Sequence, residues 1–267
     1  TDTTVTAITN FPEGFFVDTE KSKLSDTLAA DGTTVLNVYY ARELYTITFD
    51  ANGGELEGVA TADYYFNADV SVPVVTKEGY TFAGWDKNVS TVAVAPATYI
   101  AQWTANEYTI TFDAEGGTAI DPIKAAYGSE VNAPAAVTTK TGYTFGGWAE
   151  TEGETDASKA VAFPVTMPLN GTTYYAIWTP NKYTITFAET GDSVIDAITQ
   201  DYGSEIIAPA DPVKEGYTFT GWEGYTAGMT MPANAVTLTA KWTVNNYTVT
   251  WDVDGATTEE TYAYGAA

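Results

Sequence analysis

The chain of 267 residues contains no cysteine and no histidine. The lack of cysteine excludes disulfide bonds and thiolate nucleophiles. The lack of histidine excludes Ser-His-Asp and Cys-His catalysis, the usual zinc sites and the most common proton shuttle at neutral pH. Catalysis by carboxylates and metal binding through oxygen ligands are the chemistries that these two absences leave.

Basic residues are also scarce. The chain has 11 lysines and arginines and 35 aspartates and glutamates, so its net charge is −24. A surface of this sign repels phosphate backbones and anionic membranes, so we expect neither a nucleic acid nor a membrane as partner. No apolar run approaches the ~20 residues that span a bilayer. Neither a signal peptide at Thr1 nor an anchor at Ala267 is evident, so we interpret the sequence as a segment of a longer secreted protein.

What the chain does contain is an internal repeat rich in aromatic residues. Its opening block, written Tyr-Thr-Ile/Val-Thr followed by an aromatic residue, occurs at residues 45–49, 108–112, 183–187 and 247–251. The alternation of apolar residues with threonine predicts a half-buried strand. Copies at this spacing are typical of a tandem array of small units.

Further blocks follow the opening block in a constant order. In two copies an aspartate and paired glycines come next (Asp50–Gly54 and Asp113–Gly117), which predicts a hairpin turn. A third block, Gly-Tyr-x-Phe-x-Gly-Trp, occurs at residues 79–85, 142–148 and 216–222. Its second glycine predicts a β-bulge. A closing strand then ends at Trp103, Trp178 or Trp242.

These blocks divide the chain into three complete repeats and two partial ones. The expected boundaries are residues 1–44 (the C-terminal part of a repeat), 45–107, 108–182, 183–246 and 247–267 (the N-terminal part of a further repeat). The second complete repeat carries an insertion near residues 150–163. An insertion in one repeat predicts a surface loop, which is either an interaction face or a neutral excursion.

The aromatic residues at fixed repeat positions are the predicted core. Small units bury a modest share of their surface, and each aromatic side chain buries roughly 150–250 Å². The predicted core residues are Phe49, Phe82, Trp85, Trp103, Phe112, Phe145, Trp148, Trp178, Phe187, Phe219, Trp222 and Trp242.

Acidic residues offer two candidate chemistries, and neither pattern is complete. Asp50 and Asp252 each begin a sequence like the start of a calcium loop, but the twelfth positions are Thr61 and Ala263 instead of glutamate. Turn formation is the favoured interpretation, with weak calcium binding left open. Paired glutamates such as those at 150 and 152 could serve glycoside hydrolysis only across a cleft, which a small repeat does not offer. We therefore expect no enzymatic activity and no cofactor.

Tyrosines outside the repeat pattern are candidates for stacking on sugars, and they are Tyr64, Tyr65, Tyr225, Tyr262 and Tyr264. A covalent cross-link of the isopeptide or ester kind would need a buried Lys–Asn or Thr–Gln pair beside a carboxylate. Lysine recurs at no inward strand position, which disfavours such a link.

The three ordered blocks closely resemble the Listeria–Bacteroides repeat family, which includes the B-repeat of internalins. The resemblance covers nearly all of residues 45–246. It implies a β-grasp, ubiquitin-like fold in each unit, with the helix of that fold short or reduced. It also implies a place in long, secreted cell-surface proteins of bacteria, as stalk or adhesive modules. The family has no established catalytic residues, so none are carried over.

Together these observations predict a mainly β chain, a tandem array of small β-grasp units that form an elongated rod. The expected function is a non-enzymatic stalk and adhesion segment on the bacterial cell surface. The alternative is a carbohydrate- or protein-binding module whose ligand site lies on the insertion. The expected partners are other repeats of the same protein and a host or cell-surface glycan or protein.

The two partial repeats are complementary in length. Together, the segments Tyr247–Ala267 and Thr1–Glu13 contain 34 residues. In the first two complete repeats, the stretch from the opening tyrosine to the residue before the third block has the same length. One interpretation is that the chain is one period of a longer array. Another is that its ends pair between neighbouring chains by strand addition. A boundary placed inside a repeat is the third.

Overall fold

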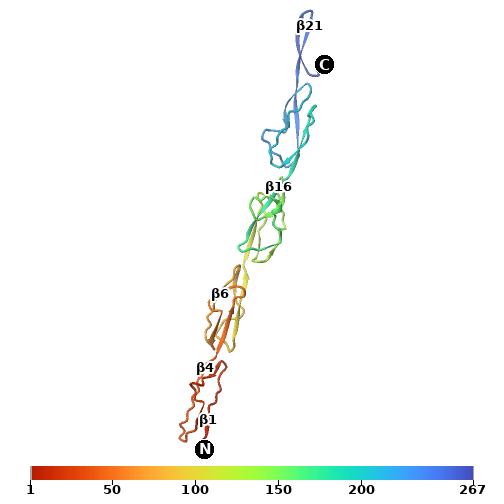
Figure 1. The fold of residues 1–267 in the computed structure, drawn as a ribbon. Helices are drawn as coiled ribbons and strands as arrows, with labels where there is room; N and C mark the ends of the chain where they lie inside the picture. Colours follow the sequence, from red (N-terminus) through yellow and green to blue (C-terminus); the bar gives the residue numbers. More distant parts are fainter. Residues whose placement is uncertain (1, 267) are drawn as a thin grey trace. The chain divides into compact units, whose positions relative to one another are not determined.

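The structure is a computed structural model that describes residues 2–266 (Figure 1). It comprises two compact units. The first contains the chain up to Tyr108 with Lys124–Glu130 and Thr166–Asn170, and the second contains Thr109–Ile123, Val131–Val165 and the chain from Gly171. Among the described residues the only helix is the 3₁₀ turn η1 (Ala157–Lys159). The prediction of a mainly β chain is confirmed.

The strands are short and follow one another along the whole described chain. Up to the second opening block they are β1 (Thr4–Thr6), β2 (Phe15–Val17), β3 (Ser25–Thr27), β4 (Tyr40–Arg42), β5 (Leu44–Asp50), β6 (Glu55–Glu57), β7 (Thr61–Tyr65), β8 (Val74–Thr76), β9 (Tyr80–Trp85) and β10 (Ala97–Ala105). The remaining strands are β11 (Glu107–Asp113), β12 (Ile123–Ala126), β13 (Glu130–Val131), β14 (Tyr143–Ala149), β15 (Val165–Thr166), β16 (Thr172–Pro180), β17 (Lys182–Ala188), β18 (Ile198–Asp201), β19 (Tyr217–Glu223), β20 (Val236–Val244), β21 (Asn246–Val253) and β22 (Ala256–Ala263).

Each complete repeat contains a four-stranded sheet with the same strand order. The orders are β7-β5-β10-β9, β12-β11-β16-β14 and β18-β17-β20-β19. The opening strand (β5, β11 or β17) and the closing strand (β10, β16 or β20) lie side by side at the centre of the sheet. They run parallel, with Ile47 opposite Ala97, Ile110 opposite Thr172 and Ile185 opposite Val236. The first and last strands of a repeat are therefore direct neighbours.

The bulge predicted in the third block is present in all three sheets. The pairing between this block and the closing strand shifts register beside Trp103, between Phe145 and Gly147, and between Phe219 and Gly221. The second glycine of the block has a φ of +116°, +124° or +128° in the three copies. Residues other than glycine rarely adopt φ angles in this region. The glycine is thus required by the backbone.

The predicted hairpin after the opening strand is only half correct. Asn52 and Gly53 do form a turn with positive φ angles of 50° and 79°, closed by the Gly54 amide donating to the Ala51 carbonyl. The next strand, β6, nevertheless pairs with β8 and not with β5. Gly54 has no room for a Cβ, because the Thr76 carbonyl and the Trp103 ring occupy that space. The chain thus leaves the main sheet and forms a second, two-stranded ladder.

The first and third complete repeats each have a small apolar core. In the first repeat the buried cluster consists of Ile47, Phe49, Val92 and Tyr99. In the third it consists of Ile185, Ile206, Trp222, Met231, Leu238 and Ala240. The central parallel strands supply inward-facing residues to both clusters.

Val92, Met167 and Met231 were missed by the sequence analysis, although they are 2%, 0% and 1% exposed. The two methionines exchange backbone hydrogen bonds with the loop after β12 or β18, for example from the Met167 amide to the Ser129 carbonyl at 2.8 Å. A recurring signal could have found them. Each residue stands eleven positions before the closing tryptophan (92 to 103, 167 to 178 and 231 to 242).

The aromatic residues predicted as core divide into three classes. Buried are Phe49, Phe112, Trp148, Trp178 and Trp222. Half-buried are Trp85, Trp103, Phe145, Phe187, Phe219 and Trp242. Phe82 is 38% exposed, which differs from the expectation. Its ring contacts Trp85 and Trp103 edge-on, at centroid distances of 5.4 and 5.5 Å.

Replacement of Trp178 by alanine should unfold the second repeat. The Trp178 indole is 7% exposed, donates to the Ala114 carbonyl at 2.9 Å and contacts Phe145. Truncation of a core aromatic costs about 3–5 kcal/mol, close to the ~3–5 kcal/mol that a core of this size supplies. Hydrogen exchange of β11 and β16 amides should then become fast. The control is Trp251→Ala, where the parent side chain is 52% exposed. Equal protection in both variants would contradict the packing.

Candidate functional site at the repeat joints

Successive repeats are joined by a single residue. A closing strand ends, one residue follows, and the next opening strand begins, as at Ala105, Asn106 and Glu107. The equivalent positions, here called the linker residues, are Glu43, Asn106, Asn181 and Asn245. A link of this length leaves little freedom, and hydrogen bonds to both repeats reduce it further.

Each linker asparagine is held by three hydrogen bonds. Its amide donates to the carbonyl of the first glycine in the third block, at 2.9 Å for Gly79 and 2.8 Å for Gly142 and Gly216. Its side-chain oxygen accepts from the threonine of that block, at 2.6 Å for Thr81 and 2.5 Å for Thr144 and Thr218. Its carbonyl accepts the amide of an aromatic residue in the next repeat, at 2.7 Å for Tyr127 and 2.8 Å for Tyr202 and Tyr264.

The same aromatic residue packs on the first glycine of the preceding third block. If these glycines carried a Cβ, that atom would overlap the ring. The distances would be 2.6 Å from Gly14 to Phe66, 2.3 Å from Gly79 to Tyr127, 2.4 Å from Gly142 to Tyr202 and 2.0 Å from Gly216 to Tyr264. Real Cβ atoms do not approach so closely, so the ring can seat only on glycine. These glycines also have positive φ angles between 74° and 86°.

A second aromatic residue completes each joint. The residue after the glycine meets the seated ring edge-on, as aromatic quadrupoles favour. The pairs and their centroid distances are Phe15 with Phe66 (5.6 Å), Tyr80 with Tyr127 (5.7 Å), Tyr143 with Tyr202 (5.4 Å) and Tyr217 with Tyr264 (6.2 Å). The joint is therefore a repeated unit of structure, built four times from equivalent positions.

Acidic residues surround the first and last joints. Glu43 replaces asparagine in the first, and its hydrogen bond from the Tyr45 hydroxyl raises the pKa of Tyr45 to about 12. The charge of Glu215 raises the pKa of Tyr264 at the last joint.

A lysine lies over two aromatic rings in every complete repeat. The ammonium groups of Lys77, Lys140 and Lys214 lie 4.7, 4.6 and 4.3 Å from the ring centroids of Tyr80, Tyr143 and Tyr217. The same groups lie 6.0, 5.8 and 5.8 Å from the closing tryptophans. Cation–π attraction holds such a group in place. The sequence analysis missed these lysines, although each stands two residues before the third block.

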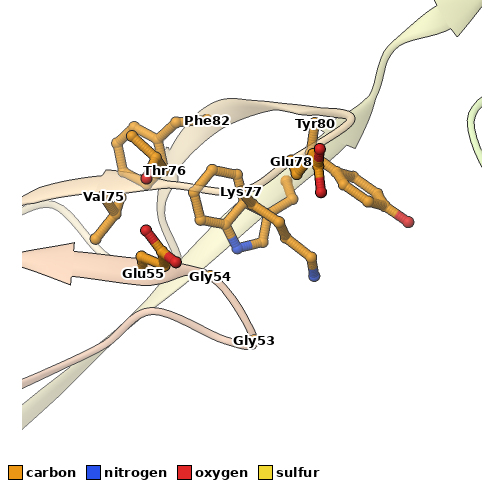
Figure 2. Close-up of a pocket in the computed structure, with 10 residues that line it drawn as sticks. Gly53, Gly54, Glu55, Val75, Thr76, Lys77, Glu78, Tyr80 and Phe82 are labelled. Carbon is orange, nitrogen blue, oxygen red and sulfur yellow. The ribbon is translucent and has the colours of Figure 1, made fainter. Parts of the chain in front are cut away.

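In the first repeat this lysine borders an open groove of about 770 Å³. Glu55, Lys77, Phe82 and Trp103 are among its lining residues. Figure 2 shows Lys77 between Glu55 on one side and Tyr80 on the other. Because Phe82 is 38% exposed and lines the groove together with Glu55 and Lys77, the groove combines apolar and charged side chains.

The insertion at residues 150–163 packs against its own repeat. A Cβ on Gly146 would lie 3.1 Å from the Cβ of Ala157, and a Cβ on Gly147 would lie 2.7 Å from the Cβ of Ala160. Phe163 contacts the Tyr174 ring at a centroid distance of 5.6 Å. The insertion therefore covers the bulge of β14, whereas no atom comes within 4 Å of a Cβ on the equivalent Gly84 or Gly221.

The aspartates predicted to form turns do so. Asp50 and Asp252 accept backbone amides of Asn52 and Gly255, at 2.8 and 2.9 Å. Within residues 2–266 no group of three acidic side chains is placed to hold a metal ion. Among the tyrosines outside the pattern, Tyr64 and Tyr225 pack against the repeat cores, while Tyr65, Tyr262 and Tyr264 are 52%, 38% and 41% exposed.

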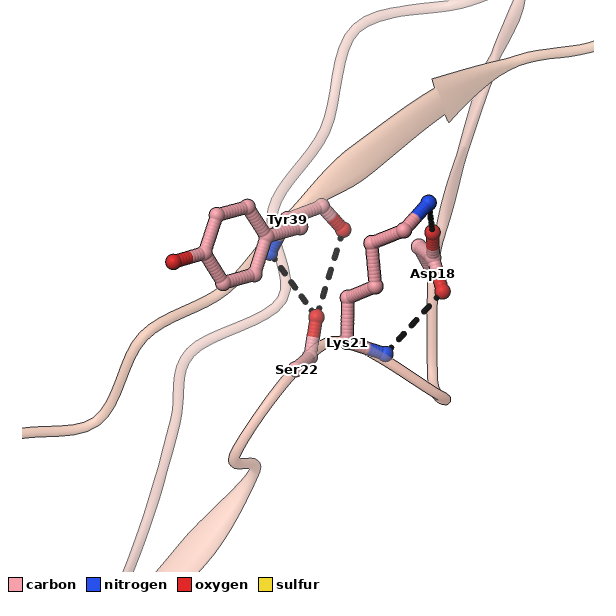
Figure 3. Close-up of polar contacts among 4 residues, drawn as sticks. All are labelled: Asp18, Lys21, Ser22 and Tyr39. Atoms are coloured by element: carbon pink, nitrogen blue, oxygen red, sulfur yellow. Dashed lines mark hydrogen bonds and ion pairs between the residues drawn. The ribbon is translucent and has the colours of Figure 1, made fainter.

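The partial repeats each contain part of the common sheet. In the first, β2 and β4 pair as the third block and closing strand do elsewhere. Its loops are tied by Ser22, whose hydroxyl accepts from the Tyr39 amide at 2.8 Å, and by an ion pair between Lys21 and Asp18 at 2.8 Å (Figure 3). In the last, β21 pairs with β22 over its full length. Among the described residues neither partial repeat has the central parallel pair.

Comparison with known proteins identifies the family. The Listeria-Bacteroides repeat domain matches three times, at residues 45–102, 108–177 and 183–241. The matches cover well over half of the chain, so the chain belongs to this family, and the resemblance noted in the sequence is confirmed.

Individual relatives are longer proteins. Two from Evansella cellulosilytica, named "Putative membrane protein" and "Putative Gly-rich membrane protein", are 33% and 30% identical over 78% and 79% of this chain. Internalin H of Listeria monocytogenes is 34% identical over 55% of it. The chain spans 33%, 27% and 27% of the lengths of these relatives. Within the described part of the chain, no helix has the length and apolar character needed to cross a membrane.

Replacement of Gly142 by alanine should loosen the joint between the second and third complete repeats. The new Cβ would overlap the Tyr202 ring, and overpacking of this kind costs about 1–3 kcal/mol. The matched control is Gly203→Ala, whose φ of +76° resembles the +81° of Gly142 but whose Cβ would meet nothing within 4 Å. Hydrogen exchange at the Tyr202 amide, which bonds the Asn181 carbonyl, should accelerate only in the Gly142 variant. Equal acceleration in both would show that backbone strain alone matters.

Proposed function

We propose that the chain is a non-enzymatic stalk and adhesion segment of a bacterial cell-surface protein. The observation that carries the proposal is the joint, because the same glycine, linker residue and aromatic ring recur at four places. A one-residue link braced in this way restrains successive repeats, which a stalk requires. The relationship to Internalin H agrees with such a setting.

We further propose that each complete repeat is a β-grasp unit whose helix has been lost. The strand order, with parallel opening and closing strands at the centre of a four-stranded sheet, supports this assignment. An array of such units in line would form an elongated rod. The net charge of −24 would keep rods on one surface apart by mutual repulsion.

The absence of histidine and cysteine from the sequence supports the non-enzymatic assignment. The glutamates at 150 and 152, which were considered as catalysts, lie in the insertion and are exposed. Adjacent, solvated carboxylates of this kind lack the defined separation across a cleft that glycoside hydrolysis needs.

Solution scattering tests the rod. Four units in line extend ~110 Å, which corresponds to a radius of gyration near ~32 Å, against ~18 Å for a compact protein of this length. We expect the larger value at low concentration. A radius of gyration near the compact value would overturn the stalk assignment.

The groove of the first repeat favours a second candidate function, binding of a glycan. The exposed face of Phe82 can stack on a sugar ring, while Glu55 and Lys77 can accept and donate hydrogen bonds. This groove is a different place from the insertion at residues 150–163, where the sequence analysis put the ligand site of the alternative function. A glycan array should then show binding that Phe82→Ala abolishes. Phe16→Ala, which removes another exposed phenylalanine, should leave binding intact. No binding by the parent chain would eliminate this candidate.

A further inference from the structure

The chain enters and leaves each complete repeat through the two central strands. In the third repeat the entering strand is β17 and the leaving strand is β20. They are parallel, with residues 185–188 opposite residues 236–239. The N-terminal end of β17 and the C-terminal end of β20 therefore project from opposite ends of the paired segment.

This arrangement decides how a pulling force acts. Tension along the chain would draw the two strands past each other in opposite directions, along their own axes. The evenly spaced hydrogen bonds of a parallel ladder lie across that direction, so they share the load and must fail together. If the strands were pulled from the same end instead, the bonds would open one after another.

Side chains reinforce the same strand pair. The Thr186 and Thr237 hydroxyls hydrogen-bond across β17 and β20 at 2.9 Å. In the second repeat Thr111 and Thr173 do so across β11 and β16 at 2.7 Å. The joints protect the ends of this segment, because the linker asparagine binds the leaving strand to the third block before the chain passes on.

We propose that the parallel opening and closing strands of each complete repeat are a mechanical clamp, which resists unfolding when the protein is stretched between its ends. The proposal rests on the stalk function, since a stalk that anchors a cell bears tension. It adds a specific load-bearing element to that function, and a specific direction in which the element is strong.

The absence of cysteine makes the direction testable in the full chain. Two cysteines are introduced as attachment points, and single molecules are pulled through them. Lys182→Cys with Thr243→Cys loads β17 and β20 in shear, because the two sites lie at opposite ends of the pair. Lys182→Cys with Ala235→Cys loads the same strands from one end. All three sites are at exposed positions. We expect a several-fold higher unfolding force in the first geometry. Equal forces in the two geometries would overturn the clamp.

A pair of isosteric variants tests the threonine contacts. Thr237→Val removes the hydroxyl bond across the loaded strands. Thr199→Val removes the 3.2 Å hydrogen bond to Thr184, which joins β17 to β18. The applied force does not pass between these two strands. Under a constant shear load, Thr237→Val should unfold about 2- to 10-fold faster than the parent chain, because one hydrogen bond across the loaded strands is lost. Thr199→Val should have little effect under the same load, although thermal stability should fall to a similar extent in both variants. Equal acceleration in both would count against a localised clamp.

These outcomes are independent of the scattering result. A rod that yields at equal force in both geometries would keep the stalk function and remove the clamp. A compact particle with a strong shear geometry would keep the clamp as a property of the repeat and remove the stalk.

Discussion

The parallel pairing of the first strand of each repeat with its last is the constraint on which the other features depend. A hairpin would bring the entry and exit of a repeat to the same end, whereas parallel neighbours place them at opposite ends. The next repeat can then begin after one linker residue. The short link, the glycine seat and the direction in which force would act all follow from this pairing.

Each joint combines a linker residue with a glycine of one repeat and an aromatic ring of the next. The side chain of each linker asparagine bonds backward to the third block, while its own carbonyl bonds forward. The aromatic ring of the next repeat fills the space that a Cβ would take on the glycine. Because both contacts recur at equivalent positions, a single solution serves every boundary between repeats.

The two variable regions are explained by the same sheet. In the second repeat the insertion covers the bulge of β14 and adds Phe163 to the aromatic contacts of the core. In the first repeat that cover is missing, and a groove lies beside the exposed Phe82. The central parallel pair recurs in all three complete repeats, and the backbone hydrogen bonds of the joint recur at all four linker residues.

Local chemistry by itself determined much of this protein. Alternation of threonine with apolar residues identifies β5, β11 and β17, and the paired aspartate and glycine positions identify turns, because strand pleating and positive φ angles are local properties. The repeat order identified the family. Only the tertiary structure decided that β6 pairs with β8, that Met167 and Met231 are buried, and that Lys77 lies on Trp103. The same holds for the glycine that receives the ring of the next repeat. These features depend on contacts between residues distant in sequence. Repeat positions mark the methionines and the lysine, but they do not say what these side chains contact.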